Sequence, residues 1–587
     1  MEPLNTIGEL VHLIDTKYKK QNAFNYQNFE GGWDSISSEE FVRQIKYLAL
    51  GLQTLGLKKG EMVGLLAASS PRWTIADIAI MIAGGVTVPL FGNISEENFE
   101  FEIQQTNLNY IFVTGDEQWE MFSHHKDAFD NVITLYDEKV DHKAFSFSEI
   151  VEQGRALDEK DPHRYQSLLD AIKPDDLATI VYTSGSTGVP KGAMLTHQNL
   201  ISLLHQDPFQ WNEDDCYLSV LPLAHIFARS VNFIMITWGI PIYYIRDIKT
   251  VGEVCKNLHP TILVVVPRIL EKIYAKLSAK VDEAGFLKRA IGHWAFDLAA
   301  DENDNSLYKK IMHPVADKIV YSAIREALGG KLRVVISGGA PLNPHLYHFF
   351  LDIGVPLFEG WGLTEAATVT CNRINDIKIG SVGVPFEGMQ VKTSPDGEIL
   401  VKGGLVMQGY YKNEEETKAA FTEDGWLRTG DKGHVDEQGH VVIEGRLKEL
   451  FKTSTGEYIA PVPIEQELCK VPLIDMAMVV AEGKKFASVL LFPDFEVLKG
   501  LKRAQSKEGL SDEEFLNGEF IKNEMNKLFE GLNLHLNHWE EIHGYKFIST
   551  PPTVEGGELT PTMKIRRSFV LRKYGELIDK IYVEEAA

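Results

Sequence analysis

The chain has 587 residues, of which 44% are hydrophobic and 24% charged, and this ordinary globular composition excludes disorder or a fibrous structure as a description of the whole chain. Its 59 basic and 83 acidic side chains give a formal charge of −24. Such a charge repels phosphodiester backbones and anionic lipid surfaces, so no nucleic acid is expected as a partner and no membrane attachment by charge alone. The cysteines lack the close spacing of a zinc cage or a disulfide framework, which fits a reducing cytosol; they are Cys216, Cys255, Cys371 and Cys469.

The amino terminus and the longest apolar window show no pattern of a secretory signal or a membrane-spanning helix. The amino terminus, Met-Glu-Pro-Leu-Asn, has neither a basic region nor an apolar core, so no secretory signal is expected. The apolar window 73–92 contains Asp77 and a pair of glycines. A helix that spans a membrane would bury Asp77 and would break at the glycines. The window therefore predicts a core helix over 74–83 and a buried strand over 86–90. A cytoplasmic protein is expected, with contact at the inner face of a membrane left open.

Roughly the first 260 residues alternate amphipathic helical stretches with short apolar runs, the pattern of α/β layers. Residues 39–55, for example, have helical apolar spacing and are followed by the strand Met62-Val-Gly-Leu-Leu66. Further strands, all read as parallel, are expected at 110–113, 178–183, 262–266 and 332–336.

The sequence pattern changes three times in the second half of the chain. Residues 269–328 are helical and charged, which predicts a helical insertion with one loop. Turn sequences multiply over 383–445 and predict short antiparallel hairpins in a small β-barrel. Beyond Arg446 the pattern returns to mixed α and β and ends in a helix from Ser568. We therefore divide the chain into domains at 1–447 and 448–587.

A segment rich in glycine and hydroxyl side chains follows the strand that ends at Thr183. Glycines let the backbone turn tightly and aim N–H groups at an anion, while the hydroxyls and one lysine add donors and charge. It is not a Walker A loop, because Pro190 precedes Lys191 and Gly192 follows it. A plain surface loop is the alternative. The candidate phosphate ligands are Thr183, Ser184, Gly185, Ser186, Thr187, Gly188 and Lys191.

Seven further motifs follow in order along nearly the whole chain. With the glycine-rich segment, they resemble the signatures of the adenylate-forming, or AMP-binding, superfamily, which contains acyl-CoA synthetases, firefly luciferase and the adenylation domains of peptide synthetases. The resemblance implies an α/β fold, with two α/β sheets and a small β-barrel in the large N-terminal domain and a smaller, mobile α+β C-terminal domain. The motifs are Leu221-Pro-Leu-Ala-His-Ile-Phe227, Ser337-Gly-Gly-Ala-Pro341, Gly360-Trp-Gly-Leu-Thr-Glu365, Thr429-Gly-Asp431, Gly445-Arg-Leu-Lys-Glu449, Gly456-Glu-Tyr458 and Leu559-Thr-Pro-Thr-Met-Lys564.

The chemistry that the resemblance implies begins with attack of a carboxylate on the α-phosphate of ATP, which gives acyl-AMP and pyrophosphate. These two anions repel each other, so the site must supply positive charge and a metal. By resemblance, Lys564 bridges the carboxylate and the phosphate. Glu365 holds Mg²⁺, and Thr364 contacts the α-phosphate.

The resemblance also places the nucleoside. Trp361 stands where the family usually has tyrosine, so stacking on adenine is kept while a phenolic hydroxyl contact is lost. Small residues at 338–340 form the opposite wall. Asp431 accepts hydrogen bonds from the ribose hydroxyls, and Arg446 adds a charged donor. The implied nucleotide-binding residues are Gly338, Gly339, Ala340, Trp361, Gly362, Asp431 and Arg446.

The acyl side of the site is assigned to His225 and Phe227. Peptide-synthetase domains usually carry an aspartate near this position for the substrate amine, and residues 221–229 hold none. A carboxylic acid without an α-amine is therefore favoured. Ala228 replaces a glutamate that long-chain synthetases often have, but the insertion at 269–328 resembles the one peculiar to them. A long-chain fatty acid is the expected substrate.

In the second half-reaction a thiol displaces AMP after the small domain rotates. Lys448 matches the family's hinge, and Gly456, Glu457 and Tyr458 match the loop that lines the pantetheine tunnel. Lys564 shares the small domain with this loop and cannot face the adenylate at the same time, so two orientations are needed. The implied ligands are ATP, Mg²⁺ and CoA.

Three rival functions stay open. The acyl group could go to a carrier protein instead of CoA. A non-catalytic acyl or nucleotide sensor has no use for the complete transition-state set of residues. A luciferase-type oxidase is not excluded by the motifs, although the insertion weighs against it. A homodimer and peripheral membrane contact are compatible with the sequence and are not specified by it.

Overall fold

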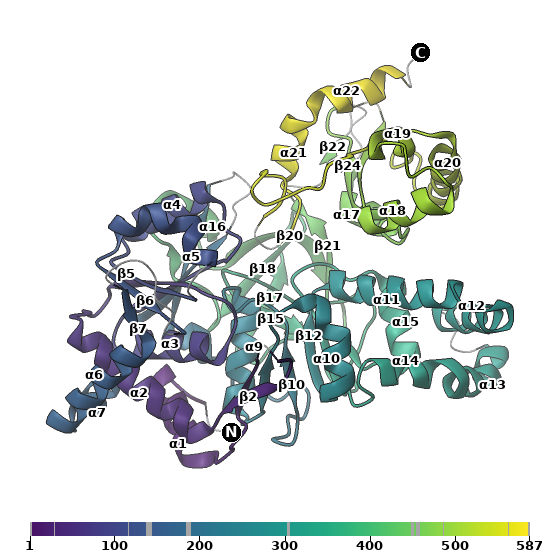
Figure 1. Ribbon diagram of the computed structural model, residues 1–587. Coiled ribbons are helices and arrows are strands. Elements are labelled where there is room, and N and C mark those ends of the chain that lie inside the picture. The colour runs from purple at the N-terminus through teal and green to yellow at the C-terminus, as the bar shows by residue number, and fades with distance from the viewer. Residues whose placement is uncertain are drawn as a thin grey trace.

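The computed structural model describes residues 3–28, 30–114, 117–136, 144–183, 189–301, 306–447, 451–452, 458–484, 486–560 and 563–584. Figure 1 shows a large body built from the N-terminal three quarters of the chain, with a smaller C-terminal unit above it and a helical arm at one side. Among the described residues, no helix combines the length and the apolar character needed to cross a bilayer.

The first sheet has eight strands in the order β19-β9-β8-β4-β3-β5-β6-β7. β4 and β5 are buried along their whole length, and β3 and β8 are buried except at their ends, as expected for parallel strands covered on both faces. The expected strands 62–66, 86–90 and 110–113 have these bounds in the structure. The strands are β3 (Met62–Leu66), β4 (Val86–Leu90), β5 (Tyr110–Val113), β6 (Asn131–Thr134), β7 (Ala144–Ser146), β8 (Leu177–Thr183), β9 (Lys191–Thr196) and β19 (Gly409–Tyr410).

The second sheet has nine strands in the order β16-β15-β14-β13-β12-β10-β11-β1-β2. The expected strands 262–266 and 332–336 are β12 and β13, which pair in parallel. β14 pairs with β15 in antiparallel fashion. The strands are β1 (Phe24–Gln27), β2 (Trp33–Ile36), β10 (Tyr217–Ser219), β11 (Ile242–Tyr244), β12 (Ile262–Val265), β13 (Val334–Ser337), β14 (Leu357–Leu363), β15 (Ala367–Cys371) and β16 (Val384–Pro385).

Buried helices join the two sheets. The expected core helix 74–83 is α3 (Pro71–Ile82), and Asp77 on it is fully buried against Arg229 of α9 (Ile226–Thr237). Arg229 donates to Asp77 Oδ2 at 2.8 Å and to Thr179 Oγ1 of β8, also at 2.8 Å. Because a buried charge is costly without a partner, this pair ties α3 and α9 to the strand that leads into the glycine-rich segment.

The remaining helices of the large body cover the sheets or form the arm, which is built from α11 to α14. They are α1 (Ile7–Lys17), α2 (Ser38–Thr54), α4 (Glu96–Thr106), α5 (Glu117–Phe122), η1 (Ser123–Ala128), α6 (Phe147–Lys160), α7 (Arg164–Asp170), α8 (His197–Ile201), η2 (Ile248–Thr250), α10 (Val251–Leu258), α11 (Pro267–Asp282), α12 (Phe286–Ala300), α13 (Leu307–Ala316), η3 (Asp317–Tyr321), α14 (Ser322–Ala327), α15 (Pro344–Asp352) and α16 (Glu414–Ala420).

The region expected as a small barrel is a four-stranded antiparallel sheet in the order β17-β18-β20-β21. Its turns lie at the glycines that the sequence pattern indicated; Gly397 and Gly439, for example, have φ values of 83° and 87°. The strands are β17 (Met389–Thr393), β18 (Glu398–Gly403), β20 (Leu427–Val435) and β21 (Val441–Arg446).

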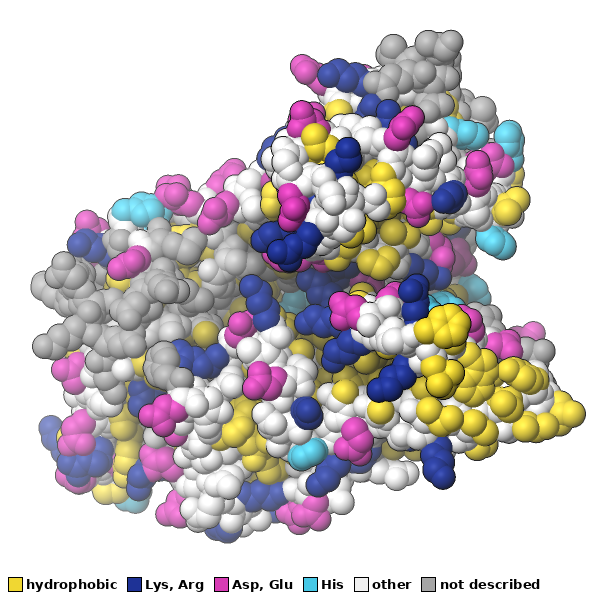
Figure 2. All heavy atoms as spheres, turned by 45° about the vertical axis from the view of Figure 1, so that its right-hand side comes forward, with side chains coloured by type: hydrophobic (Ala, Val, Ile, Leu, Met, Phe, Trp, Pro, Cys, Tyr) yellow, Lys and Arg dark blue, Asp and Glu magenta, His cyan; other side chains and the backbone are white. Residues whose placement is uncertain are grey.

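The C-terminal unit has its own core and a three-stranded sheet, β24-β25-β26. The expected terminal helix from Ser568 is two helices, because the chain leaves helical geometry at Tyr574. Figure 2 shows the unit overhanging the arm, with Lys and Arg side chains in the recess between them. Its elements are β22 (Phe451–Lys452), β23 (Tyr458–Ile459), α17 (Pro461–Leu468), β24 (Ile474–Val480), β25 (Ala487–Pro493), α18 (Phe495–Ala504), α19 (Asp512–Leu516), α20 (Glu519–Asn533), β26 (Ile542–Phe547), α21 (Arg567–Lys573) and α22 (Gly575–Glu584).

Candidate active site

The C-terminal unit reaches the large body through a lysine. Lys564 Nζ donates to the carbonyl oxygen of Gly339 at 2.6 Å. Two further contacts flank this one: Gln466 Nε2 donates to Pro341 O at 2.7 Å, and Asn343 Nδ2 donates to Glu467 Oε1 at 3.2 Å. The small domain therefore sits directly over the loop that follows β13, with its motif lysine pointing inward.

The loop under Lys564 needs small residues. Gly339 has φ +81°, a conformation that favours glycine. A Cβ on Gly338 would lie 3.0 Å from the ring of Phe227. The motif Gly360-Trp-Gly362 is also sterically constrained, because a Cβ on Gly362 would lie 1.8 Å from the carbonyl oxygen of Ala367. These glycines allow β13, β14 and the start of α9 to approach one another closely.

Trp361, Asp431 and Arg446 form one connected group. The Trp361 indole donates to Asp431 Oδ2 at 2.9 Å, and Arg446 Nε lies 2.9 Å from Asp431 Oδ1. Asp431 is buried on β20, and Arg446 is its cross-strand partner on β21. The indole that replaces the family's tyrosine thus has a polar contact of its own, because its N–H orients the carboxylate.

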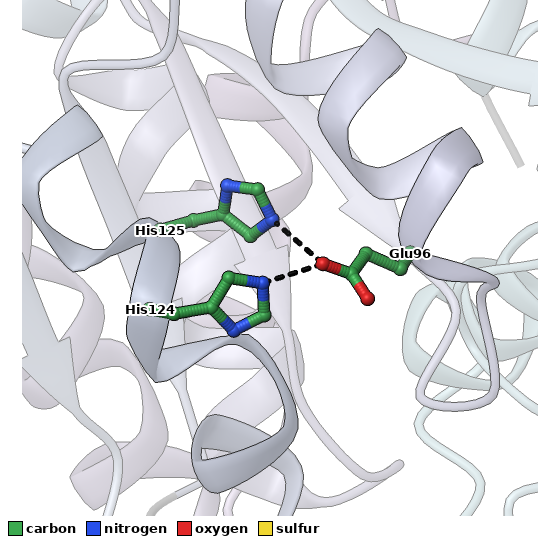
Figure 3. Close-up of side chains that lie close together, drawn as sticks. All are labelled: Glu96, His124 and His125. Carbon is green, nitrogen blue, oxygen red and sulfur yellow. Dashed lines mark hydrogen bonds and ion pairs between the residues drawn. The ribbon is translucent and has the colours of Figure 1, made fainter.

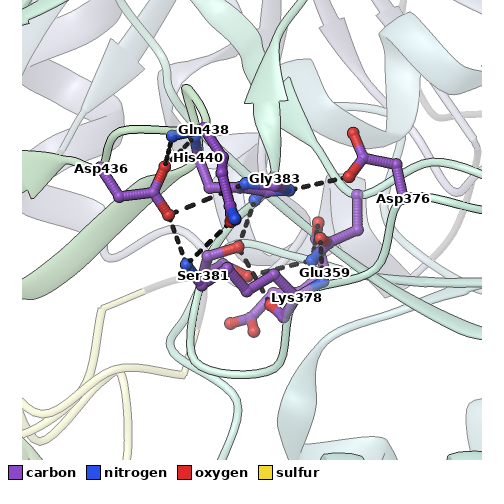
Figure 4. Close-up of polar contacts among 9 residues, drawn as sticks. Glu359, Asp376, Lys378, Ser381, Gly383, Asp436, Gln438 and His440 are labelled. Carbon is purple, nitrogen blue, oxygen red and sulfur yellow. Dashed lines mark hydrogen bonds and ion pairs between the residues drawn. The ribbon is translucent and has the colours of Figure 1, made fainter.

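A polar network holds the strands that carry this group (Figure 4). Lys378 Nζ lies 2.5 Å from Asp436 Oδ2, and His440 Nε2 lies 2.9 Å from Asp376 Oδ1. The hydrogen bond from Lys378 lowers the pKa of Asp436 to about 2, so this carboxylate is charged at neutral pH. The network fastens the β20–β21 turn to the loop between β15 and β16, and so fixes Asp431 opposite Trp361.

A second cluster joins the glycine-rich segment to the motif glutamate. Lys191, at the start of β9, lies 2.5 Å from Glu416 and 5.5 Å from the ring centroid of Tyr410. The Tyr410 hydroxyl donates to Glu365 Oε1 at 2.7 Å. Burial and the nearby Glu365 carboxylate raise the Tyr410 pKa, so the hydroxyl keeps its proton. Lys191 and Glu365, which are 174 positions apart, therefore share one site.

Glu365 and Thr364 lie in the turn between β14 and β15, and both are half-buried. Among the described residues, no hydrogen bond engages the second carboxylate oxygen of Glu365. A carboxylate with one oxygen oriented by Tyr410 and the other available is a suitable ligand for a hard divalent cation.

His225 is a neutral side chain at the start of α9. Phe227 N donates to its Nδ1 at 3.2 Å, so in the neutral ring the proton lies on Nε2. Burial, and secondly the charge of Lys564, lower the pKa of His225 to about 4. Its Nε2–H is therefore a donor at neutral pH, in the region that Lys564 also reaches.

An apolar cavity of about 30 Å³ lies behind Phe227. It is enclosed by α9, the segment that precedes β10 and strands of the second sheet, and its lining includes Phe209, Trp211, Val231, Ile336 and Phe386. A groove of about 280 Å³ elsewhere, between the N-terminal segment and the β17–β18 sheet, contains none of the candidate site residues.

The structure brings together most of the residues expected at the site. Trp361, Asp431 and Arg446 are in contact, and Lys564 meets Gly339. Ala340 belongs to the same loop. Thr183 ends β8 opposite Lys191, and only the backbone of Tyr458 is described. The expected residues Ser184, Gly185, Ser186, Thr187, Gly188, Lys448, Gly456 and Glu457 lie outside the described residues.

Three residues at the site were not expected from the sequence. Tyr410 and Glu416 belong to no motif and reach the site because β19 pairs with β9. Glu359, on β14, accepts the N–H of Leu342 at 3.0 Å, and burial raises its pKa to about 8. Glu359 is an acidic residue in an apolar run, directly before Gly360, and this was the sequence signal that could have indicated it.

Two family models match the chain. The AMP-binding enzyme model matches residues 15–411, and the AMP-binding enzyme C-terminal domain model matches residues 449–586. Together they span both the large body and the C-terminal unit.

Curated relatives and solved structures agree with these matches. The long-chain-fatty-acid–CoA ligase FadD15 of Mycobacterium bovis is 34% identical over 569 residues, 95% of this chain and 94% of that relative. Long chain acyl-CoA synthetase 6, peroxisomal, of Arabidopsis thaliana is 31% identical over 575 residues, 92% of this chain and 80% of that relative. The A domain of a carboxylic acid reductase from Segniliparus rugosus, solved with AMP and a co-purified carboxylic acid, shares the fold with a TM-score of 0.75 at 22% identity, covering 99% of this chain and 94% of that one.

Proposed function

This chain belongs to the AMP-binding enzyme family, and from that premise we propose that it joins a long-chain fatty acid to CoA in two steps driven by ATP. The observation that carries the proposal is the contact between Lys564 and Gly339, which puts a cation of the small domain against the loop to which we assign the nucleotide. The curated relatives named as long-chain fatty acid ligases support the choice of substrate.

In the first step a fatty carboxylate oxygen bonds to the α-phosphorus of ATP, the bond to the β-phosphate oxygen breaks, and pyrophosphate leaves. The barrier includes the repulsion between two anions. Lys564 offsets that repulsion from the Gly339 side, and His225 Nε2–H donates to the carboxylate. Both groups are in place before the substrates meet, so little reorganisation is needed.

The nucleoside binds between the 338–340 loop and Trp361. Asp431 holds the ribose hydroxyls while Arg446 and the Trp361 indole fix its orientation. Thr183 and Lys191, together with the glycine-rich segment between them, hold the phosphates. This arrangement gives ATP a fixed direction, with its α-phosphate toward Thr364 and Lys564.

The donor set fits Mg²⁺ as the companion of ATP. Glu365 offers an oriented carboxylate, and Mg²⁺ usually combines one or two carboxylates with phosphate oxygens and water. When bound, the ion neutralises charge on the phosphates. Tyr410 holds Glu365, and Glu416 holds Lys191, so the two charged side chains stay apart from each other.

The fatty chain is proposed to extend past Phe227 into the apolar region around the small cavity. A volume of about 30 Å³ is small beside that of a long alkyl chain, so the lining side chains must move before such a chain enters. Phe227 lines this cavity and its backbone N–H donates to His225 Nδ1, so we assign it the role of a gate.

In the second step the CoA thiol loses its proton to solvent and its sulfur bonds to the acyl carbon. The bond between that carbon and the phosphate oxygen breaks, and AMP leaves. We place the hinge at Lys448 and the pantetheine-lining loop at Gly456, Glu457 and Tyr458. The boundary between the domains at 447 and 448 is part of the same proposal. The end of one family model at 411 and the start of the next at 449 support it.

The test is release of AMP across a ladder of fatty acids, with CoA and carrier-protein phosphopantetheine as separate acceptors. We expect ATP- and CoA-dependent product with long chains. Product with carrier protein alone would identify the carrier protein, and not CoA, as the acceptor. Oxygen-dependent light emission would indicate the luciferase-type rival. Nucleotide binding without any product would indicate the sensor.

Asp431→Ala is expected to weaken ATP binding much more than fatty acid binding. Hydrogen bonds to a charged group contribute about 1.5–3 kcal/mol each, so loss of even one should raise the KM for ATP more than about tenfold. The KM for the fatty acid should stay near wild type. Asp396→Ala, an exposed aspartate in a turn of the same sheet, is the control. An unchanged KM for ATP would contradict the ribose assignment.

We further propose peripheral contact with an anionic membrane through the arm. Phe286 and Leu287 are 90% and 70% exposed at the start of α12, and a second apolar row follows α13 and η3 at intervals of four residues: Leu307, Ile311, Val315 and Ile319. Figure 2 shows hydrophobic side chains gathered on this arm. Lys288, Lys310 and Lys318 are exposed beside the row and form no ion pair with the described residues.

Flotation with vesicles tests this contact. The doubly substituted variant Ile311→Asp, Ile319→Asp should lose binding to vesicles that contain phosphatidylglycerol, while Leu534→Asp, an equally polar change at an exposed site of the small domain, should not. Binding should weaken at high salt because of the lysines. Equal flotation of both variants would contradict the proposal. Self-association that only the double variant loses would assign the face to a homodimer.

A further inference from the structure

A cluster of metal-ligating side chains lies outside the nucleotide site. Glu96 is the first residue of α4, and His124 and His125 are neighbours in η1. His124 Nε2 lies 2.6 Å from Glu96 Oε1, and His125 Nε2 lies 3.5 Å from the same oxygen. All three ligand atoms lie within 4.8 Å of one another. Figure 3 shows both rings pointing their Nε2 atoms at the carboxylate.

Aromatic packing holds the two elements in this position. Phe99 of α4 stacks on Phe122, which directly precedes η1, with ring centroids 4.1 Å apart. Phe99 also lies 5.7 Å from the ring of His125, and the two imidazoles are 4.2 Å apart. Consecutive residues of a 3₁₀ helix normally project about 120° apart. Here both rings converge on one oxygen, so the convergence is a feature of tertiary packing.

The donor set matches a late first-row metal. Zn²⁺ binds imidazole nitrogen and carboxylate oxygen at about 2.0–2.2 Å, which places tetrahedral ligand atoms about 3.3 Å apart. The His125–Glu96 separation of 3.5 Å already fits. The His124–Glu96 pair is at hydrogen-bond length, and both side chains are more than half exposed, so they can open by the small amount required. Mg²⁺ and Ca²⁺ favour oxygen ligands over imidazole.

We propose that Glu96, His124 and His125 form a Zn²⁺ site with a fourth position open to water. A glutamate carboxylate is ordinarily charged at neutral pH, as a metal ligand must be. The site lies on the surface, so the metal enters directly from solvent.

The site would clamp an element that supports the nucleotide-binding strand. At the other end of α4, Gln105 Oε1 accepts the Tyr182 hydroxyl at 2.6 Å, and Gln105 O accepts Lys412 Nζ at 2.7 Å. Tyr182 precedes Thr183 at the end of β8. A metal that joins η1 to α4 therefore stiffens the helix that backs this strand. This role is independent of the proposed reaction, and its test needs no substrate.

The test is binding of Zn²⁺, and of Co²⁺ as a coloured substitute, to chelator-treated full-length protein. We expect one equivalent of Zn²⁺ to bind and raise the melting temperature in a concentration-dependent way, and Co²⁺ to give the visible absorption of a tetrahedral site. His124→Ala, His125→Ala and Glu96→Gln should each abolish the melting shift and the Co²⁺ spectrum. Metal-free melting should stay unchanged in His124→Ala and Glu96→Gln, because these two side chains are more than half exposed. His125→Ala should also lower the metal-free melting temperature, because His125 is only 18% exposed and packs against Phe99.

His293→Ala is the matched control. His293 is also an exposed histidine beside a carboxylate, 2.9 Å from Asp282, but among the described residues no second imidazole joins this pair. This variant should retain full binding. If His124→Ala and the wild type bind Zn²⁺ equally, or if His293→Ala alone loses it, the site is not the one proposed. Absence of a bound equivalent in the wild type overturns the proposal outright.

Discussion

Lys564→Ala is expected to reduce adenylate formation by about a hundredfold or more while leaving transfer from supplied acyl-AMP largely intact. The structure gives the reason for the difference. Lys564 Nζ lies 2.6 Å from Gly339 O, beside the residues assigned to the nucleotide, and its charge matters while a carboxylate and a triphosphate meet. Once acyl-AMP has formed, those two separate anions no longer exist.

The measurement follows pyrophosphate exchange and acyl-CoA production separately. Lys527→Ala removes an exposed lysine from α20 of the same domain and should leave both rates near wild type. Lys564→Ala should also keep its affinity for ATP within a small factor, because we assign the nucleoside to Asp431 and Trp361. Equal loss in both half-reactions would contradict the role given to Lys564.

Much of the fold can be predicted from the sequence, because its central strands are continuous apolar runs. The bounds 62–66, 86–90 and 110–113 are reproduced since each run is buried on both faces and flanked by polar or turn residues. The break in the terminal helix could not be predicted in this way. Tyr574 leaves the helix where its hydroxyl meets Glu558 at 3.1 Å, a contact to a residue outside the helix.

The same limit applies to the site. Motif residues could be named because each motif is local, but the groups that orient them come from distant strands. Tyr410 reaches Glu365 only because β19 adds to the edge of the first sheet, where it pairs with β9. The hydrogen bond from Trp361 to Asp431 links positions 70 residues apart. No periodicity in either segment indicates such a pairing.

The contacts between the domains suit one half-reaction. Lys564, Gln466 and Glu467 all meet the loop or helix that follows β13, so this orientation presents the adenylating lysine. The loop assigned to the pantetheine arm lies on the same small domain. Because that domain has its own hydrophobic core, we expect it to move as a unit between the two half-reactions. A hinge between the domains is therefore required by the proposed function.

Lys448→Pro is expected to preserve adenylate formation and reduce CoA thioester formation to background. Proline fixes φ near −65° and removes one N–H, so a hinge at this residue can no longer make the backbone change that rotation needs. We assign the observed orientation, in which Lys564 meets Gly339, to adenylate formation, so that orientation should be the one retained. Lys448→Ala, which removes the side chain and leaves the backbone free, should keep both activities.

The experiment measures pyrophosphate exchange and acyl-CoA production in both variants, with thermal melting to establish that each is folded. Chemical transfer from supplied acyl-AMP to CoA should fail in Lys448→Pro as well, since the block lies in the domain rotation and not in the first step. This outcome is the reverse of that for Lys564→Ala. The two variants together distinguish the effect of the lysine charge on adenylation from the effect of domain rotation on transfer to CoA. A folded Lys448→Pro variant with both activities near wild type would place the hinge, and with it the domain boundary, elsewhere in the chain.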